Sequence, residues 1–114
     1  MSECVFCKII AGEIPSNKVY EDDEVIAFRD IAPQAPVHVL VVPKAHVQDI
    51  LHVDPDSGVM AAVTRGVQQV AKALALDPDG IRVVNNCGKK AGQTVYHLHF
   101  HVLSGQQMSE HMCG

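Results

Sequence analysis

Residues 94–103, TVYHLHFHVL, contain the pattern that decides the fold. His97, His99 and His101 occupy every second position, and apolar residues lie between them. Because successive side chains of a β-strand point to opposite faces, this alternation predicts a strand with three imidazoles on one face. The apolar side chains would share the other face: Tyr96, Leu98, Phe100 and Val102. We therefore expect one side of this strand to face a core and the other to face a site.

The rest of the chain predicts an α+β fold with a five-stranded antiparallel sheet. A short helix is expected over 5–11, and the other strands over 18–22, 24–31, 37–44 and 81–86. The one long helix is expected over 54–76, with Asp54 as its N-cap and Pro55 in its first helical position. Its apolar stripe at helical spacing should pack on the sheet: Val59, Val63, Val67, Val70 and Leu74.

Composition limits the possible functions. The length of 114 residues corresponds to one domain, 1–114, and 47% hydrophobic with 19% charged residues is ordinary for a globular protein. The net charge of -4 and the absence of a basic cluster argue against a nucleic-acid partner. No apolar run approaches a membrane span and no secretory signal precedes the first strand, so a cytoplasmic protein is expected. There, a close cysteine pair indicates metal or redox chemistry before a disulfide.

The three histidines have a bland interpretation and two chemical ones. A solvated polar face is usually built from serine, threonine and lysine, so three histidines favour a function. The imidazoles could bind a metal, or one could act as a nucleophile while another carries a proton. The preceding loop, NCGKKAGQT (86–94), favours the second interpretation, because its glycines let backbone N–H groups converge on a phosphate.

The signature HLHFHVL resembles the His-x-His-x-His-x-x motif of the histidine-triad (HIT) superfamily. Segments 6–46 and 86–105 are similar to its Hint branch, the histidine-triad nucleotide-binding proteins. The resemblance implies a HIT-like fold whose sheet continues across a homodimer. It also implies hydrolysis of purine nucleoside 5′-phosphoramidates, which releases an AMP-like nucleotide and an amine through a nucleotidyl-histidine intermediate. Catalysis would need no metal.

The resemblance also implies roles for individual residues. His99 resembles the nucleophile, His101 the residue that contacts the phosphate and assists the leaving group, and His97 the structural first member of the triad. His38 resembles a fourth active-site histidine that supports the nucleophile. Asp30 resembles the carboxylate that accepts hydrogen bonds from the ribose hydroxyls.

Further residues resemble the remaining nucleotide contacts of the family. The phosphate and leaving-group contacts would be Asn86, Gly92, Gln93 and Thr94. The apolar slot for the base would be formed by Val5, Phe6, Ile9, Phe28 and Ile31. For these apolar residues, the sequence alone is equally consistent with ordinary core positions.

The pair CVFC (4–7) has the spacing of half a zinc site, although two buried core thiols would give the same spacing. The resemblance implies a structural zinc bound by Cys4, Cys7, His46 and His97. Zinc would then support the strand beneath His99 without taking part in catalysis. Cys87 and Cys113 have no expected partner.

Three rival functions remain open at this point. A dinucleoside polyphosphate hydrolase of the Fhit type would use the same histidines, but that branch usually follows the triad with a proline-containing segment, where this chain has VLSG. A regulatory nucleotide-binding protein with weak catalysis would not need four intact histidines. A purely structural zinc module would leave Asp30 unexplained. The chain departs from close relatives at Arg29 and in its tail, SEHMCG, which has no tryptophan.

Overall fold

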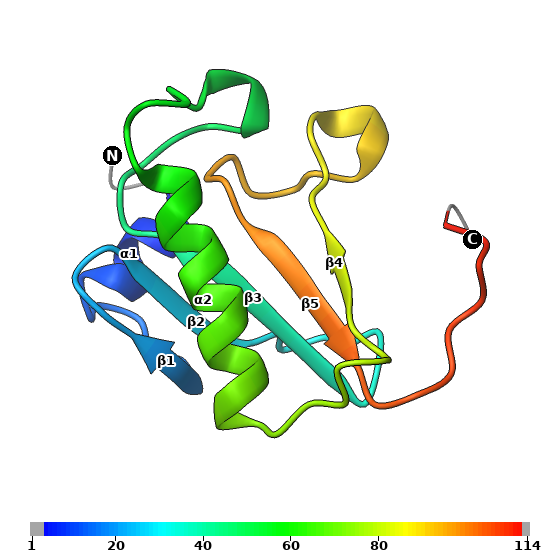
Figure 1. Ribbon diagram of the computed structural model, residues 1–114. Helices are drawn as coiled ribbons and strands as arrows, with labels where there is room; N and C mark the ends of the chain where they lie inside the picture. The colour runs from blue at the N-terminus through cyan, green and yellow to red at the C-terminus, as the bar shows by residue number, and fades with distance from the viewer. Residues whose placement is uncertain (1–3, 113–114) are drawn as a thin grey trace.

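The computed structural model describes residues 4–112, and within them the chain forms an α+β fold around a five-stranded antiparallel sheet (Figure 1). The strand order is β1-β2-β3-β5-β4, and every neighbouring pair is antiparallel, as predicted. The strands are β1 (Lys18–Glu21), β2 (Val25–Arg29), β3 (Val37–Pro43), β4 (Arg82–Val84) and β5 (Phe100–Ser104). Cys113 lies outside the described residues.

The long helix α2 (Val59–Ala73) crosses one face of the sheet and contacts β1, β2 and β3 (Figure 1). The short helix α1 (Val5–Ile10) precedes β1, and two 3₁₀ turns, η1 (Ile50–His52) and η2 (Lys89–Ala91), lie in the connections. In the described part of the chain, no helix is long and apolar enough to cross a membrane.

Each face of the sheet carries its own apolar cluster. The residues toward α2 include the predicted helix stripe, with Val63 and Val70 buried and Val59, Val67 and Leu74 packed around them. The opposite face carries a smaller cluster that α1 covers: Phe6, Ile26, Phe28, Leu40 and Val42. The second cluster matters for function because the histidines point to this side.

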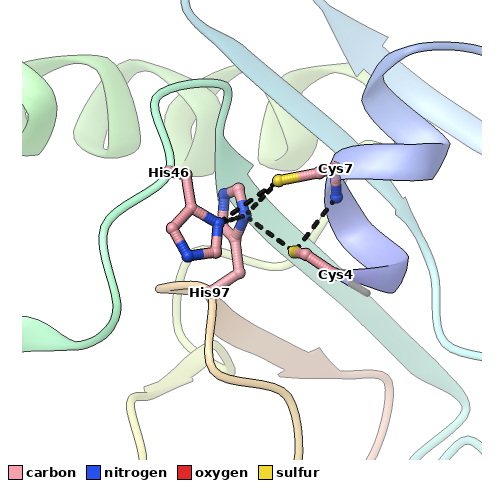
Figure 2. Close-up of side chains that lie close together, drawn as sticks. All are labelled: Cys4, Cys7, His46 and His97. Atoms are coloured by element: carbon pink, nitrogen blue, oxygen red, sulfur yellow. Dashed lines mark hydrogen bonds between the residues drawn. The ribbon is translucent and has the colours of Figure 1, made fainter. Parts of the chain in front are cut away.

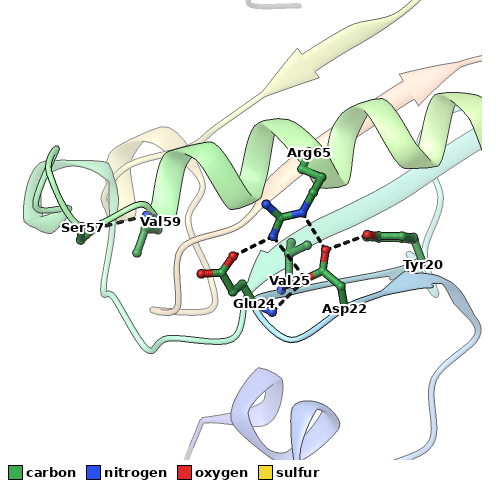
Figure 3. A network of polar contacts seen from close by, with 7 residues as sticks. All are labelled: Tyr20, Asp22, Glu24, Val25, Ser57, Val59 and Arg65. Atoms are coloured by element: carbon green, nitrogen blue, oxygen red, sulfur yellow. Dashed lines mark hydrogen bonds and ion pairs between the residues drawn. The ribbon is translucent and has the colours of Figure 1, made fainter.

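A polar network joins α2 to the connection between β1 and β2 (Figure 3). The Arg65 guanidinium donates to Asp22 at 2.8 Å and to Glu24 at 2.9 Å. Asp22 also accepts hydrogen bonds from the Tyr20 hydroxyl and from the backbone N–H groups of Glu24 and Val25. The carboxylate of Asp22 therefore fixes the turn and the helix at once.

The helix α2 begins at Val59, four residues later than Pro55, the first helical position that we predicted. Asp54 caps a turn instead, because its carboxylate accepts the N–H of Asp56 and its carbonyl accepts the N–H of Ser57. Gly58 then adopts φ +84°, a left-handed conformation that interrupts a helix. The helix also ends at Ala73, before the predicted residue 76.

The last strand begins at Phe100, whereas the sequence predicted it from residue 94. The ladder is shorter because β3 pairs with β5 only as far as Phe100, opposite Val41, and β4 pairs only as far as His101, opposite Val84. The alternation nevertheless extends back to His97. Leu98, Phe100 and Val102 are buried toward α2, while His97 and His99 are buried on the other side. Tyr96, which was expected on the core face, is 44% exposed.

Candidate active site and metal cluster

His38 and His101 meet because they lie on adjacent strands. In the antiparallel register between β3 and β5, Leu40 lies opposite His101 and His38 lies opposite Leu103, so the two histidines are diagonal neighbours on one face. His38 Nε2 is 2.8 Å from His101 Nδ1. The pair is separated by 63 positions in the chain and is brought together only by the sheet.

Hydrogen bonds to the backbone define the tautomers of this pair. The N–H of Gln34 donates to His38 Nδ1 at 2.9 Å, so this nitrogen carries no proton. The proton of neutral His38 is therefore on Nε2, which donates to His101 Nδ1. His101 is then left with its own proton on Nε2, where it can be donated to a bound molecule.

His99 has the opposite arrangement. Its Nδ1 lies 2.7 Å from the carbonyl oxygen of His97, and a carbonyl can only accept, so Nδ1 carries the proton. The Nε2 lone pair of His99 is therefore available. The ring centroids of His99 and His101 lie 5.3 Å apart. The site thus combines a free lone pair with a neighbouring N–H donor.

Burial favours the neutral form of the three triad imidazoles. It lowers the pKa of His97 and His99, and it lowers that of His101 to about 4, with the neighbouring His99 and His38 as further causes. The Asp30 carboxylate opposes this effect at His99 and His101. At neutral pH the nitrogen lone pairs are consequently not consumed by protons.

Asp30 follows β2 and lies beside the histidine pair. One carboxylate oxygen, Oδ1, accepts the N–H of Ala32 at 2.7 Å, and the other, Oδ2, lies 3.4 Å from His38 Nε2. The second oxygen is only partly engaged at that distance. It therefore has capacity for a further hydrogen-bond donor such as a hydroxyl.

Two thiols and two imidazoles form a second cluster beside the first (Figure 2). Cys4 and Cys7 come from α1 and its N-terminal cap, His46 from the loop after β3, and His97 from the segment before β5. All four ligand atoms lie within 4.8 Å of one another. In Figure 2 the sulfurs and the Nδ1 atoms face a common centre.

The distances in this cluster suit a tetrahedral metal ion. Cys7 Sγ lies 3.2 Å from His46 Nδ1 and 3.5 Å from His97 Nδ1, and the two nitrogens are 3.1 Å apart. Zinc–sulfur and zinc–nitrogen bonds of ordinary length give tetrahedral S···N and N···N edges of about 3.5 Å and about 3.4 Å. Cys4 Sγ lies 3.4 Å from His97 Nδ1, which fits the same geometry.

The tautomer of His97 also suits metal binding. Its Nε2 donates to the carbonyl of Pro43 at 2.7 Å, which leaves the Nδ1 lone pair directed at the two sulfurs. Burial, together with the adjacent Cys4 sulfur, raises the pKa of Cys7 to about 11. A metal ion acts in the opposite direction, because coordination deprotonates a thiol. These four residues could hold a metal.

The sequence of this chain matches a known protein family over most of its length. A family model described as "HIT domain" matches residues 11–108. The chain belongs to the HIT family.

Two relatives of this HIT protein match it over nearly their whole length. It is 43% identical to "Protein HitA" of Neisseria gonorrhoeae over 104 residues, which cover 90% of this chain and 96% of the relative. It is 44% identical to "14 kDa zinc-binding protein" of Brassica juncea, with 94% and 96% covered. The solved "HIT family hydrolase from Clostridium thermocellum" is 42% identical, with a TM-score of 0.93 and 98% of both chains covered. The predicted superfamily and fold are confirmed.

The loop over residues 86–94 of this HIT protein is braced by Gln93, one of the residues predicted to contact phosphate. Gln93 is buried, its Oε1 accepts the N–H of Gly88 at 2.8 Å, and its Nε2 donates to the carbonyls of Gln48 and Val95. The side chain of Gln93 thus shapes the loop from within. Thr94 is exposed, and Gly92 adopts φ +91° at the end of η2.

Sequence reasoning missed Asn85, the neighbour of the predicted contact Asn86. The Asn85 amide donates to the carbonyl of His99 at 2.9 Å, whereas Asn86 is half-buried. A polar residue at the end of a strand that leads into a glycine loop was the available signal, but two adjacent asparagines gave no basis for choosing between them. Asn85 holds the backbone of His99 where the ladder has not yet begun.

The residues of the predicted base slot differ in their exposure to solvent. Phe6 and Phe28 are buried, with ring centroids 5.6 Å apart, and Ile9 is half-buried against the same cluster. Val5 is on the exposed side of α1, and Ile31 is fully exposed. The structure thus places Phe6, Phe28 and Ile9 in or against the apolar cluster on this face and leaves Val5 and Ile31 exposed beside it.

Proposed function

We propose that this HIT protein hydrolyses purine nucleoside 5′-phosphoramidates and belongs to the Hint branch. The observation that carries the proposal is the pairing of complementary tautomers, with a lone pair on His99 Nε2 and a proton on the neighbouring His101 Nε2. Displacement at phosphorus with an amine leaving group needs both groups side by side. The similarity to a structure named a HIT family hydrolase supports the same reaction class.

The proposed reaction has two displacements. His99 Nε2 attacks the phosphorus of a substrate that is protonated on its phosphoramidate nitrogen, the phosphorus–nitrogen bond breaks, and the neutral amine leaves with its own hydrogens, while His101 Nε2–H donates a hydrogen bond to a phosphoryl oxygen. Water then attacks the nucleotidyl-histidine, the bond to His99 breaks, and the nucleoside monophosphate is released, while the proton that the water loses is taken up by the amine product. His38 keeps its support of His101 throughout, since its N–H already donates to His101 Nδ1.

The remaining predicted residues would bind the nucleotide. Asp30 would accept the ribose hydroxyls with its partly engaged Oδ2. Backbone N–H groups of the loop around Gly92, with the exposed hydroxyl of Thr94 and the amide of Asn86, would contact the phosphate and the leaving group. The base would lie against the α1 face of Phe6 and Phe28, with Val5, Ile9 and Ile31 at its edges.

We also propose that the Cys4, Cys7, His46 and His97 cluster binds a structural zinc ion. Two thiolates and two imidazoles complete a closed tetrahedral set, and such closed sites stabilise a fold. A relative named a zinc-binding protein supports this choice of metal. Zinc analysis of the purified protein, with Cys4→Ser as the metal-free comparison, tests it.

A homodimer with a continuous sheet is a further part of the proposal. Strand β4 is at the edge of the sheet, and its central residue, Val83, is 47% exposed. An edge strand offers unpaired backbone groups to a second copy. Light scattering should give the mass of a dimer for the wild type and of a monomer for Val83→Lys, and a monomeric wild type would exclude this assembly.

The deciding experiment compares adenosine 5′-phosphoramidate with a diadenosine polyphosphate as substrates. The wild type should turn over the phosphoramidate, and His99→Ala should lose about 10³-fold or more in kcat/KM. His52→Ala, a histidine substitution on the η1 turn, serves as the matched control and should retain the activity.

Each alternative has its own outcome. Faster turnover of the polyphosphate would replace the proposal with an Fhit-type hydrolase. Tight AMP binding without turnover of either substrate would favour a regulatory nucleotide-binding protein. Equal activity of the wild type and His99→Ala would remove His99 as the nucleophile.

A further inference from the structure

Helix α1 has few attachments of its own. It spans six residues, all within the described part of the chain, and among them only Phe6 is buried. Ile9 and Ile10 are half-buried against the same apolar cluster. A helix of this length is not stable by itself, because the free-energy cost of nucleation exceeds the gain from its few hydrogen bonds. The position of α1 must therefore be set by what Phe6 and its neighbours contact.

The two cysteines of the metal cluster flank Phe6 in the chain. Cys4 caps α1, its sulfur accepting the N–H of Cys7 at 3.3 Å, and Cys7 lies one residue after Phe6. Their partners, His46 and His97, belong to the loop after β3 and to the segment before β5. A metal at this cluster would consequently fasten α1 to the sheet at both sides of Phe6.

The Phe6 ring lies close to the proposed nucleophile, His99, and to a residue of the predicted base slot, Phe28. Its centroid lies 5.0 Å from that of His99 with an interplanar angle of 88°, and 5.6 Å from that of Phe28. It also lies 6.1 Å from the ring of the metal-cluster residue His97. His99 makes one ring hydrogen bond within the described residues, at Nδ1, so a packed neighbour is needed to limit its other movements.

We infer that Phe6 is a positioning residue for His99 and that the metal cluster controls it by fixing α1. With the metal bound, the ring closes one side of the His99 imidazole and forms a wall of the nucleotide site. Without the metal, α1 leaves this position, Phe6 no longer bounds the nucleotide site, and the affinity for the nucleotide falls. The inference rests on the proposed function, since it assigns a control mechanism to the same site.

The first test measures AMP binding by calorimetry, with zinc-loaded and chelator-stripped protein. Affinity should fall about tenfold or more when the metal is removed, and the same loss is expected for Cys7→Ser. Cys87→Ser is the matched thiol substitution outside the cluster and should retain the metal. Hydrogen exchange should quicken in residues 5–10 of the stripped protein, while α2 stays protected.

The second test observes His99 directly by the NMR shifts of its ring C–H groups, which the nearby Phe6 ring perturbs. Phe6→Leu keeps an apolar side chain but removes the ring, so these shifts should change while zinc content stays at the wild-type level. Phe28→Leu removes the second ring of the same pair and should leave the His99 shifts near their wild-type values. Stripping the metal from the wild type should reproduce the Phe6→Leu shifts.

The two proposals fail in different ways. If the zinc-loaded wild type binds no AMP, the proposed function is wrong, and the NMR shifts still decide the role of Phe6. If AMP affinity and the His99 shifts are both unchanged by metal removal, α1 is fixed without the metal and the inference is overturned.

Discussion

At the scale of single residues, the histidines are distinguished by the partner of their second ring nitrogen. His97 donates to a carbonyl and directs a lone pair at the thiols, while His99 donates to another carbonyl and keeps a lone pair for the site. His38 accepts from a backbone N–H and passes its own proton toward His101. Identical side chains thus acquire different chemistry from the backbone groups around them.

The protonation of His101 predicts how stability depends on pH. The pKa of His101 is about 4 in the folded chain, whereas an unfolded histidine titrates near about 6.5. As the pH falls through this interval, the unfolded state gains a proton that the folded state does not accept, so the free energy of unfolding decreases, by at most about 3 kcal/mol. Urea unfolding across this interval should show the decrease.

His101→Gln isolates this contribution, because glutamine does not titrate. Its free energy of unfolding should fall less steeply than that of the wild type over the same pH interval, although His97 and His99, whose pKa values burial also lowers, still contribute. Equal slopes in the two proteins would contradict the assignment.

At the scale of elements, α2 approaches the sheet closely because residue 66 is glycine. A Cβ at Gly66 would lie 2.7 Å from Val41 Cγ1 and 3.1 Å from Val25 Cγ2, both on buried strands. Gly66→Ala should therefore lower the free energy of unfolding by about 1–2 kcal/mol, since overpacking exceeds the gain in helix propensity. Urea denaturation measures this loss, and Gly66→Ala combined with Val41→Ala should be less destabilised than the sum of the single changes.

The Arg65 network links the same helix to the β1–β2 connection. The Arg65 guanidinium holds the pKa of Asp22 well below its usual range, with the Tyr20 hydroxyl and two backbone N–H groups adding to the effect. Arg65→Met should lower the urea midpoint and reduce its sensitivity to salt, because the ion pairs are partly exposed and screened. A midpoint that remains at the wild-type value would show that the Arg65 ion pairs add no net stability.

At the scale of the whole molecule, the metal cluster joins segments that are distant in the sequence. Metal binding contributes to folding free energy when the unfolded chain has no preformed site. Chelation, or Cys4→Ser, should therefore lower the midpoint of thermal unfolding by about 10 °C or more in scanning calorimetry. Cys87→Ser should stay close to the wild type, and a chelator-resistant midpoint would argue against a structural metal.

Local periodicity predicted much of the molecule. The alternation around His99 and the helical spacing of Val63 and Val70 identified elements whose buried faces the structure confirms. The triad motif identified the superfamily, which the match to the HIT domain confirms. Such features are encoded within ten to twenty consecutive residues, so a single sequence displays them.

Contacts that depend on the register of distant strands could not be predicted in the same way. The bond between His38 and His101 follows from the pairing of β3 with β5. The start of α2 was missed because the Asp54 turn and the left-handed Gly58 compete with helix formation locally. The Gln93 amide donates to the carbonyls of Gln48 and Val95, which lie in two different segments, and no sequence motif indicates these hydrogen bonds.

The segment that ends in β5 has two faces with separate duties. Leu98 and Val102 face α2, whereas His99 and His101 face the other side of the sheet. Substitutions on the first face act through the hydrophobic core, and those on the second act on the histidine cluster. Alternate positions of one short stretch of chain can therefore be redesigned for two different purposes, the packing of the core at one set and the chemistry of the histidine cluster at the other.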